Sequence, residues 1–189
     1  MTLEKYAGQG VVLLGCGKIG SALLRGWLNK GLPPNAVTVS TPNPSAWLQG
    51  LVGHGLRLNV EFPKAPAVVL IAVKPQVMGQ VLPGLCRLSD QVVFLSVAAG
   101  IPLASYTAAL GVGRPIIRAM PNIPVAVGRG TTALIGNDYA SRANMALAQE
   151  LLSAVGKTVL LDSETQMDAV TAVSGSGPAY VFHLIEVLC

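Results

Sequence analysis

Gly10-Val11-Val12-Leu13-Leu14-Gly15-Cys16-Gly17-Lys18-Ile19-Gly20 is the stretch that decides the fold. Its apolar run predicts a buried strand, and the spacing of Gly15, Gly17 and Gly20 matches the turn that binds a dinucleotide diphosphate. The first glycine allows the tight bend, the second lets the backbone approach the diphosphate, and the third lets the following helix pack on the strand. An amphipathic pattern over residues 19–27 predicts that helix. We therefore favour dinucleotide binding over a purely structural glycine turn.

Short apolar runs alternate with helical patterns along the rest of the chain, which is typical of βαβ units. This alternation predicts an α/β fold with a Rossmann-type, doubly wound and mostly parallel sheet. It ends near residues 161–164, so we predict a dinucleotide-binding domain over 1–162 and the incomplete beginning of an all-helical domain over 163–189. Further strands are expected over 36–40, 67–73, 92–96, 115–119, 131–135 and 157–161, with helices over 45–52, from 75, over 102–109, 143–155 and 165–172, and from 178 onward.

Composition narrows the class of protein. Of the 189 residues, 51% are hydrophobic and 12% charged, and the formal net charge is +4. The 13 basic residues are scattered along the chain rather than gathered in basic runs, which argues against nucleic-acid binding. The uncharged stretch 91–113 is long enough for a membrane helix, but Gly100-Ile101-Pro102 interrupts it, so we expect no membrane span. Three cysteines give neither a disulfide framework nor a metal-ligand spacing, so we expect a cytoplasmic protein without a metal.

The turn after the second predicted strand bears on the choice of cofactor. NAD-binding proteins usually place an acidic residue there to hold the ribose hydroxyls, whereas this chain has Ser40-Thr41-Pro42-Asn43. Without a carboxylate there is no repulsion against a 2′-phosphate, and hydroxyl and amide donors are present, although no arginine is. We expect NADPH, with NADH possible; the alternative is that these residues only form a turn.

Three further segments carry polar groups beside predicted strand ends. Lys74 directly follows the strand over 67–73 and either faces the cofactor phosphates or is a solvated loop lysine. Arg118 is as compatible with a structural ion pair as with ligand binding, and Asn122 is placed to orient a carboxamide or the substrate. The stretch 174–180, Ser-Gly-Ser-Gly-Pro-Ala-Tyr, predicts a tight turn followed by a helix beginning at Pro178. That turn suits either an amide-lined pocket for a small carboxylate or an ordinary capped helix.

Residues 15–20, 72–75, 118–124 and above all 168–180 resemble the pyrroline-5-carboxylate reductase family. The resemblance implies a Rossmann domain followed by a helical domain that makes a homodimer or higher homo-oligomer and completes the active site. It also implies NAD(P)H-dependent reduction of 1-pyrroline-5-carboxylate to L-proline. Family members continue through several more helices, so the chain is expected to be truncated. The alternatives are another NADP-dependent imine or β-hydroxyacid dehydrogenase, and a non-catalytic dinucleotide-binding module.

The site residues expected from the motifs and the resemblance fall into two groups. The cofactor-binding residues are Leu14, Gly15, Cys16, Gly17, Lys18, Ile19, Gly20, Ser21, Ser40, Pro42, Asn59, Ala72, Val73, Lys74, Pro75, Val97, Ala98, Ala99 and Asn122. The substrate-positioning residues are Glu164, Ser174, Gly175, Ser176, Gly177 and Pro178, with no firm general acid among them.

Overall fold

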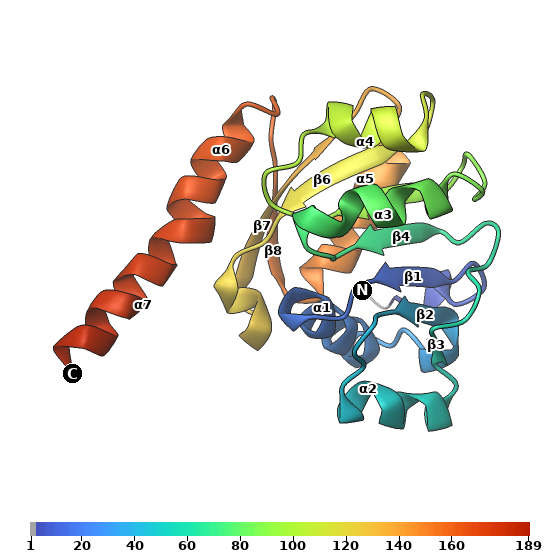
Figure 1. Ribbon diagram of the computed structural model, residues 1–189, viewed down its shortest axis with the longest axis horizontal. Coiled ribbons are helices and arrows are strands. Elements are labelled where there is room, and N and C mark those ends of the chain that lie inside the picture. Colours follow the sequence, from blue (N-terminus) through green and yellow to red (C-terminus); the bar gives the residue numbers. More distant parts are fainter. Residues whose placement is uncertain (1–2) are drawn as a thin grey trace.

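The computed structural model describes residues 3–189 of the chain. Its strands form one sheet in the order β3-β2-β1-β4-β5-β6-β7-β8 (Figure 1). Neighbouring strands run parallel except β6 and β7, which are antiparallel. The predicted Rossmann-type, mostly parallel sheet is therefore confirmed. The strands are β1 (Val11–Leu14), β2 (Val37–Ser40), β3 (Arg57–Leu58), β4 (Val68–Ile71), β5 (Val93–Ser96), β6 (Ile116–Met120), β7 (Gly130–Gly136) and β8 (Gly156–Leu160).

Helices cover both faces of the sheet, which explains why the central strands are apolar throughout. Alternate residues of β1 point to opposite sides: Leu13 packs in a core with α1, α2 and α5, and Val12 packs in a second core with α3 and α4. The α-helices are α1 (Lys18–Asn29), α2 (Ala46–Gly50), α3 (Met78–Val81), α4 (Leu103–Leu110), α5 (Arg142–Ser153), α6 (Gln166–Val170) and α7 (Gly177–Leu188), and the shorter helical turns are η1 (Glu4–Tyr6), η2 (Pro34–Ala36), η3 (Leu51–His54), η4 (Pro75–Val77), η5 (Leu82–Leu85) and η6 (Ile123–Val127).

The helix predicted from residue 75 is broken into η4, α3 and η5. Pro83 lies inside η5 and has no backbone N–H to continue the helical hydrogen bonds, and glycines at 79 and 84 weaken the same segment. The two-residue edge strand β3 was not predicted, because a run of two residues has no detectable periodicity.

One continuous helical segment formed by α6, the π-helical turn η7 (Thr171–Ser176) and α7 projects away from the sheet (Figure 1). The tight turn and free helix start predicted at Ser174–Pro178 are therefore wrong. The Gly177 N–H donates to the Ala172 carbonyl five residues back, as in a π-helix. The ring of Pro178 would collide with the carbonyl four residues before it in a regular α-helix, and the wider π-turn relieves that crowding.

No helix among residues 3–189 has both the length and the apolar character needed to cross a membrane. The uncharged stretch 91–113 is folded into β5 and α4. Within the same described residues, His, Cys, Asp and Glu side chains form no cluster of three that would suit a metal ion.

Candidate functional site

The glycine turn between β1 and α1 forms the centre of the candidate site. Gly15 has φ +91°, and a Cβ there would lie 2.7 Å from the Ala72 carbonyl oxygen, so only glycine fits. A Cβ on Gly20 would collide with the Gly15 carbonyl, which lets α1 pack closely against the turn. A Cβ on Gly17, in contrast, would meet no atom within 4 Å. The space beside Gly17 is therefore open for a ligand to approach the backbone.

A groove runs from this turn along the carboxyl ends of the parallel strands. One part, of about 490 Å³, lies between the turn and the end of β2, and a second part lies between the turn and the loop after β5. The two parts share Gly17 and residues 72–74, so they form one groove. The predicted cofactor residues that line it are Leu14, Gly15, Cys16, Gly17, Lys18, Ile19, Ser40, Pro42, Ala72, Val73, Lys74, Pro75, Val97, Ala98 and Ala99.

Two residues predicted to bind the cofactor support the turn from behind rather than line the groove. Gly20 is buried under the turn. The Ser21 hydroxyl donates to the Gly17 carbonyl at 2.7 Å, which orients that peptide group. Gly17 is also the N-cap of α1 and offers no side-chain cap. The first N–H groups of α1 thus remain available to an anion.

Cys16 lies within the glycine turn, where burial raises the pKa of its thiol to about 11. The side chain is therefore neutral at physiological pH and adds no negative charge beside the groove. Lys18 and Lys74 are both exposed at the groove, so the charges nearest to it are positive.

A third cavity continues the groove beyond the end of β2. It is about 500 Å³ in volume and shares Ser40, Thr41 and Pro42 with the groove. Asn59 lines it, but its side-chain amide is already used: Oδ1 accepts from the Thr41 N–H at 2.8 Å, and Nδ2 donates to the Thr41 carbonyl at 2.9 Å. Asn59 therefore fixes the turn after β2. Arg87 also lines this cavity and was missed by sequence analysis, because no local pattern links it to β2.

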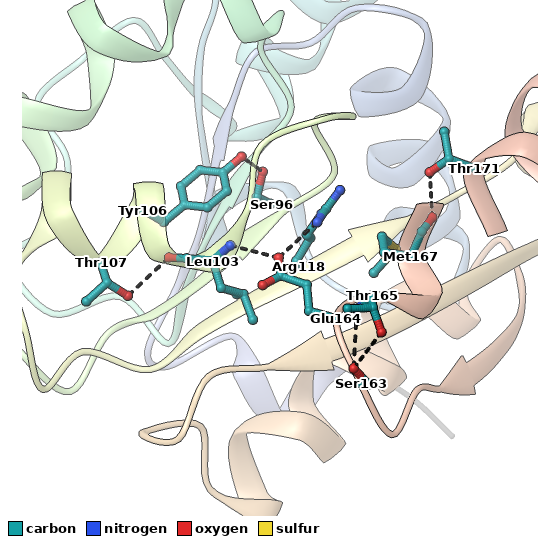
Figure 2. Close-up of polar contacts among 10 residues, drawn as sticks. All are labelled: Ser96, Leu103, Tyr106, Thr107, Arg118, Ser163, Glu164, Thr165, Met167 and Thr171. Atoms are coloured by element: carbon teal, nitrogen blue, oxygen red, sulfur yellow. Dashed lines mark hydrogen bonds and ion pairs between the residues drawn. The ribbon is translucent and has the colours of Figure 1, made fainter. Parts of the chain in front are cut away.

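Glu164 lies at the junction between the sheet and the C-terminal helix. Its Oε1 accepts from the Arg118 guanidinium at 2.9 Å and from the Leu103 N–H at 2.8 Å (Figure 2). The Arg118 side chain is 7% exposed and the Glu164 side chain 30%, so the guanidinium is buried while the carboxylate is half-buried. The ion-pair interpretation of Arg118 is thus the one that the geometry supports. Gly100 and Pro102 join the pair in lining a small cavity immediately after the groove loop 97–99.

A buried hydroxyl pair holds the loop at the end of β5. Ser96 and Tyr106 share a hydrogen bond (Figure 2). The Ala98 N–H also donates to the Ser96 hydroxyl at 3.2 Å. Burial raises the pKa of Tyr106, which keeps the phenol protonated. The backbone of the groove loop is therefore fixed by neutral side chains beneath it.

Asn122 joins the π-helical turn to the sheet. Its Nδ2 donates to the Ser174 hydroxyl at 3.1 Å, and its Oδ1 accepts from the Thr131 N–H at 2.9 Å. Gly175 in the same turn lies against Met120 at the end of β6. Asn122 does not line the groove, and its polar atoms hold Ser174 in place. The adjoining η6 contacts α1, so the π-helical turn and the glycine turn are connected through one short segment.

These features fit a dinucleotide. The groove has an open glycine where a diphosphate must approach backbone, an uncapped helix start facing it, and small residues at the far end. A dinucleotide would lie across the carboxyl ends of β2, β1, β4 and β5, the edge at which open α/β sheets bind ligands.

Two family models match the chain. The model described as NADP oxidoreductase coenzyme F420-dependent matches residues 10–100, and the model described as pyrroline-5-carboxylate reductase dimerisation matches residues 164–189. Among curated proteins, the pyrroline-5-carboxylate reductase of Pseudomonas aeruginosa is 39% identical over 184 residues, a match that covers 94% of this chain and 67% of that protein. The chain belongs to the pyrroline-5-carboxylate reductase family.

Solved structures of the family share the fold. A pyrroline-5-carboxylate reductase from Coxiella burnetii superimposes with a TM-score of 0.81 at 29% identity, covering 95% of this chain and 68% of that one. The pyrroline carboxylate reductase of Plasmodium falciparum, solved with NADP bound, gives a TM-score of 0.84 at 24% identity, covering 96% and 68%. The chain thus spans about two thirds of the length of these reductases. The segment that matches the dimerisation model begins at Glu164 and includes η7 and α7.

Proposed function

We propose that this protein reduces 1-pyrroline-5-carboxylate to L-proline with NADPH. The observation that carries the proposal is the continuous groove at the carboxyl edge of the sheet, together with a π-helical turn that Asn122 holds to β7 within a segment matching the pyrroline-5-carboxylate reductase dimerisation model. Membership of the family supports the reaction, and the match of residues 10–100 to an NADP oxidoreductase model supports the cofactor.

NADPH, when bound, supplies the hydride that adds to the carbon of the protonated C=N bond. The backbone at Gly17 and the start of α1 hold the diphosphate. Residues 97–99, which are small and fixed from below by Ser96 and Tyr106, leave room for a flat ring at the end of β5. The chain's main contribution is to position the two reactants and exclude water, because a protonated imine is already a good electrophile.

The substrate-binding residues in this proposal are Glu164 and the segment Ser174–Pro178. Glu164 carries a half-buried negative charge, paired with Arg118, at the junction of the groove loop and the segment that matches the dimerisation model. Asn122 holds Ser174 on the same side of the fold. Residues 1–162 then form the cofactor domain and residues 163–189 the first part of the substrate and dimerisation domain.

The proposal includes a homodimer formed through the C-terminal helices. No side chain of α7 is buried, although most of the helix is apolar. A second copy of the chain would cover it, as the dimerisation model for residues 164–189 suggests. Cys16, Cys86 and Cys189 are all free thiols, which fits a cytoplasmic location.

The test is turnover by the purified dimer. Loss of NADPH absorbance and appearance of proline are measured with 1-pyrroline-5-carboxylate, with a six-membered cyclic imine, and with β-hydroxyacids plus NADP⁺. We expect turnover with the five-membered imine carboxylate and none when it is omitted. An inactive dimer that binds NADPH, or a preference for hydroxyacids, would contradict the proposal.

A further inference from the structure

The cavity beyond the end of β2 has a chemistry that the sequence did not reveal. It meets the groove at Ser40, Thr41 and Pro42, so it receives whatever extends past the adenosine ribose of a bound dinucleotide. No carboxylate lines it among residues 3–189, and its one cationic lining residue is Arg87. The cavity is therefore suited to an anionic group.

Arg87 is available to such a group. Within residues 3–189, its guanidinium takes part in none of the hydrogen bonds or ion pairs, and the side chain is exposed. The Asn59 amide, in contrast, is occupied by the Thr41 backbone. The hydroxyls of Ser40 and Thr41 have no hydrogen-bond partner in the same part of the chain. These two hydroxyls and one planar guanidinium make up a donor set for a phosphate.

A second arginine fixes the segment that carries Arg87. The buried Arg114 guanidinium donates to the carbonyls of Leu85 at 3.3 Å, Cys86 at 2.7 Å and Leu88 at 3.1 Å. It also pairs with Asp90 at 3.0 Å. The backbone is thus held on both sides of residue 87. Binding through a fixed segment loses less conformational entropy than binding through a mobile loop.

We infer that Arg87 binds the 2′-phosphate of NADPH and makes the groove prefer NADPH to NADH. The inference rests on the proposed function, since it concerns one end of the same cofactor. The cation comes from the segment between η5 and β5, a strand that β1 and β4 separate from β2 in the sheet, rather than from the turn after β2. The absence of arginine from Ser40-Thr41-Pro42-Asn43 is thereby compensated by tertiary structure.

The test compares calorimetric binding of 2′,5′-ADP and 5′-ADP, which differ by the phosphate in question. The wild-type protein, Arg87→Gln, Arg87→Lys and Arg142→Gln are measured. Arg142 is an exposed arginine at the start of α5, away from the cavity lining, and is the matched control. Retained circular dichroism and melting temperature confirm folding of each variant.

We expect Arg87→Gln to weaken 2′,5′-ADP binding by about tenfold to a hundredfold, because the charge-assisted hydrogen bonds to the 2′-phosphate are lost. Binding of 5′-ADP should stay unchanged. Arg87→Lys keeps the positive charge but not the planar guanidinium, so its affinity for 2′,5′-ADP should fall less. Arg142→Gln should bind 2′,5′-ADP as the wild type does. Equal weakening of both ligands, or unchanged binding, would overturn the role of Arg87 while leaving the proposed function standing. Binding of neither ligand by the wild-type protein would contradict the proposed function itself.

Discussion

At the scale of single residues, the glycines of the cofactor turn perform two different tasks. Gly15 is required by the fold, because its φ of +91° and its contact with Ala72 leave no place for a side chain. Gly17 has open space beside it and an ordinary backbone conformation, so the fold tolerates a methyl group there. The same motif therefore contains one position that serves stability and one that serves binding.

Substitution by alanine separates these tasks. Gly15→Ala should lower the free energy of unfolding by at least about 1–3 kcal/mol through backbone strain. Gly17→Ala should leave the free energy of unfolding nearly unchanged. It should weaken NADPH binding by about tenfold or more, because the added methyl group keeps the diphosphate away from the backbone at a cost of roughly one charge-assisted hydrogen bond.

Urea unfolding and fluorescence titration with NADPH measure the two effects. Gly31→Ala is the control for a positive φ outside the groove, at +87° with no atom near the added Cβ. It should cost stability without changing the cofactor affinity of the folded protein. A Gly17→Ala protein that binds NADPH as the wild type does would contradict the placement of the diphosphate at this turn.

The residue-level predictions from sequence succeeded where the signal is local. The spacing of the glycines placed the turn correctly, because turn, strand end and helix start follow one another in the chain. Arg87 escaped notice because its proximity to Ser40 depends on how η5 packs against the sheet. The Arg118 interpretation stayed open for the same reason, since its partner Glu164 follows much later in the sequence.

At the scale of elements, apolar runs located the strands well, and most boundaries differ by one residue. The glycines and the proline of Ser174–Pro178 led to the wrong prediction of a tight turn there. Those residue types usually form turns, but here α6 continues through a π-turn into α7, because packing on Met120 and the bond to Asn122 hold the segment in helical form. Such tertiary contacts leave no periodic signal in the sequence.

The link between β7 and the π-turn can be tested by removing its two ends separately. Ser174→Ala deletes one hydrogen bond of about 0.5–1.5 kcal/mol. Asn122→Ala also leaves the Thr131 N–H without its partner, at a further cost of about 1–3 kcal/mol. We expect both variants to raise the KM for pyrroline carboxylate and to leave the NADPH dissociation constant within about twofold.

Steady-state kinetics and thermal unfolding measure these changes. Asn122→Asp is a useful comparison, because one carboxylate oxygen keeps the acceptor for Thr131 and the other can accept a hydrogen bond from the Ser174 hydroxyl. Its KM should therefore stay closer to that of the wild type than the KM of Ser174→Ala, and it should retain more stability than Asn122→Ala. Unchanged KM in both Ser174→Ala and Asn122→Ala would argue against a substrate-positioning role for the π-turn.

At the scale of the whole molecule, the sheet with its helices and the C-terminal helical segment differ in where their apolar side chains lie. The sheet and its helices bury their apolar residues in two cores, one on each face. The segment beyond Glu164 projects outward (Figure 1). On α7, the side chains of Phe182, Ile185 and Leu188 are 54%, 51% and 76% exposed. A helix that is apolar on nearly all sides is stable in water only when another surface covers it.

The proposed occupant of that surface is a second copy of the chain, so a charge on α7 should break the dimer. Phe182→Lys loses the burial of one aromatic side chain, about 1.5–3 kcal/mol, and places a charge at the interface, which should raise the dimer dissociation constant by at least about tenfold.

Sedimentation velocity over a range of concentrations measures this constant. Val112→Lys is the control, because Val112 is 77% exposed after α4 and lies outside the proposed interface. Since Ser174 to Pro178 run from η7 into the first turn of α7, the Phe182 variant should also lose imine reduction while the folded cofactor domain still binds NADPH. A Phe182→Lys protein with the same dimer dissociation constant as the wild type would show that α7 does not form the interface. The substrate pocket would then have to be completed by other residues.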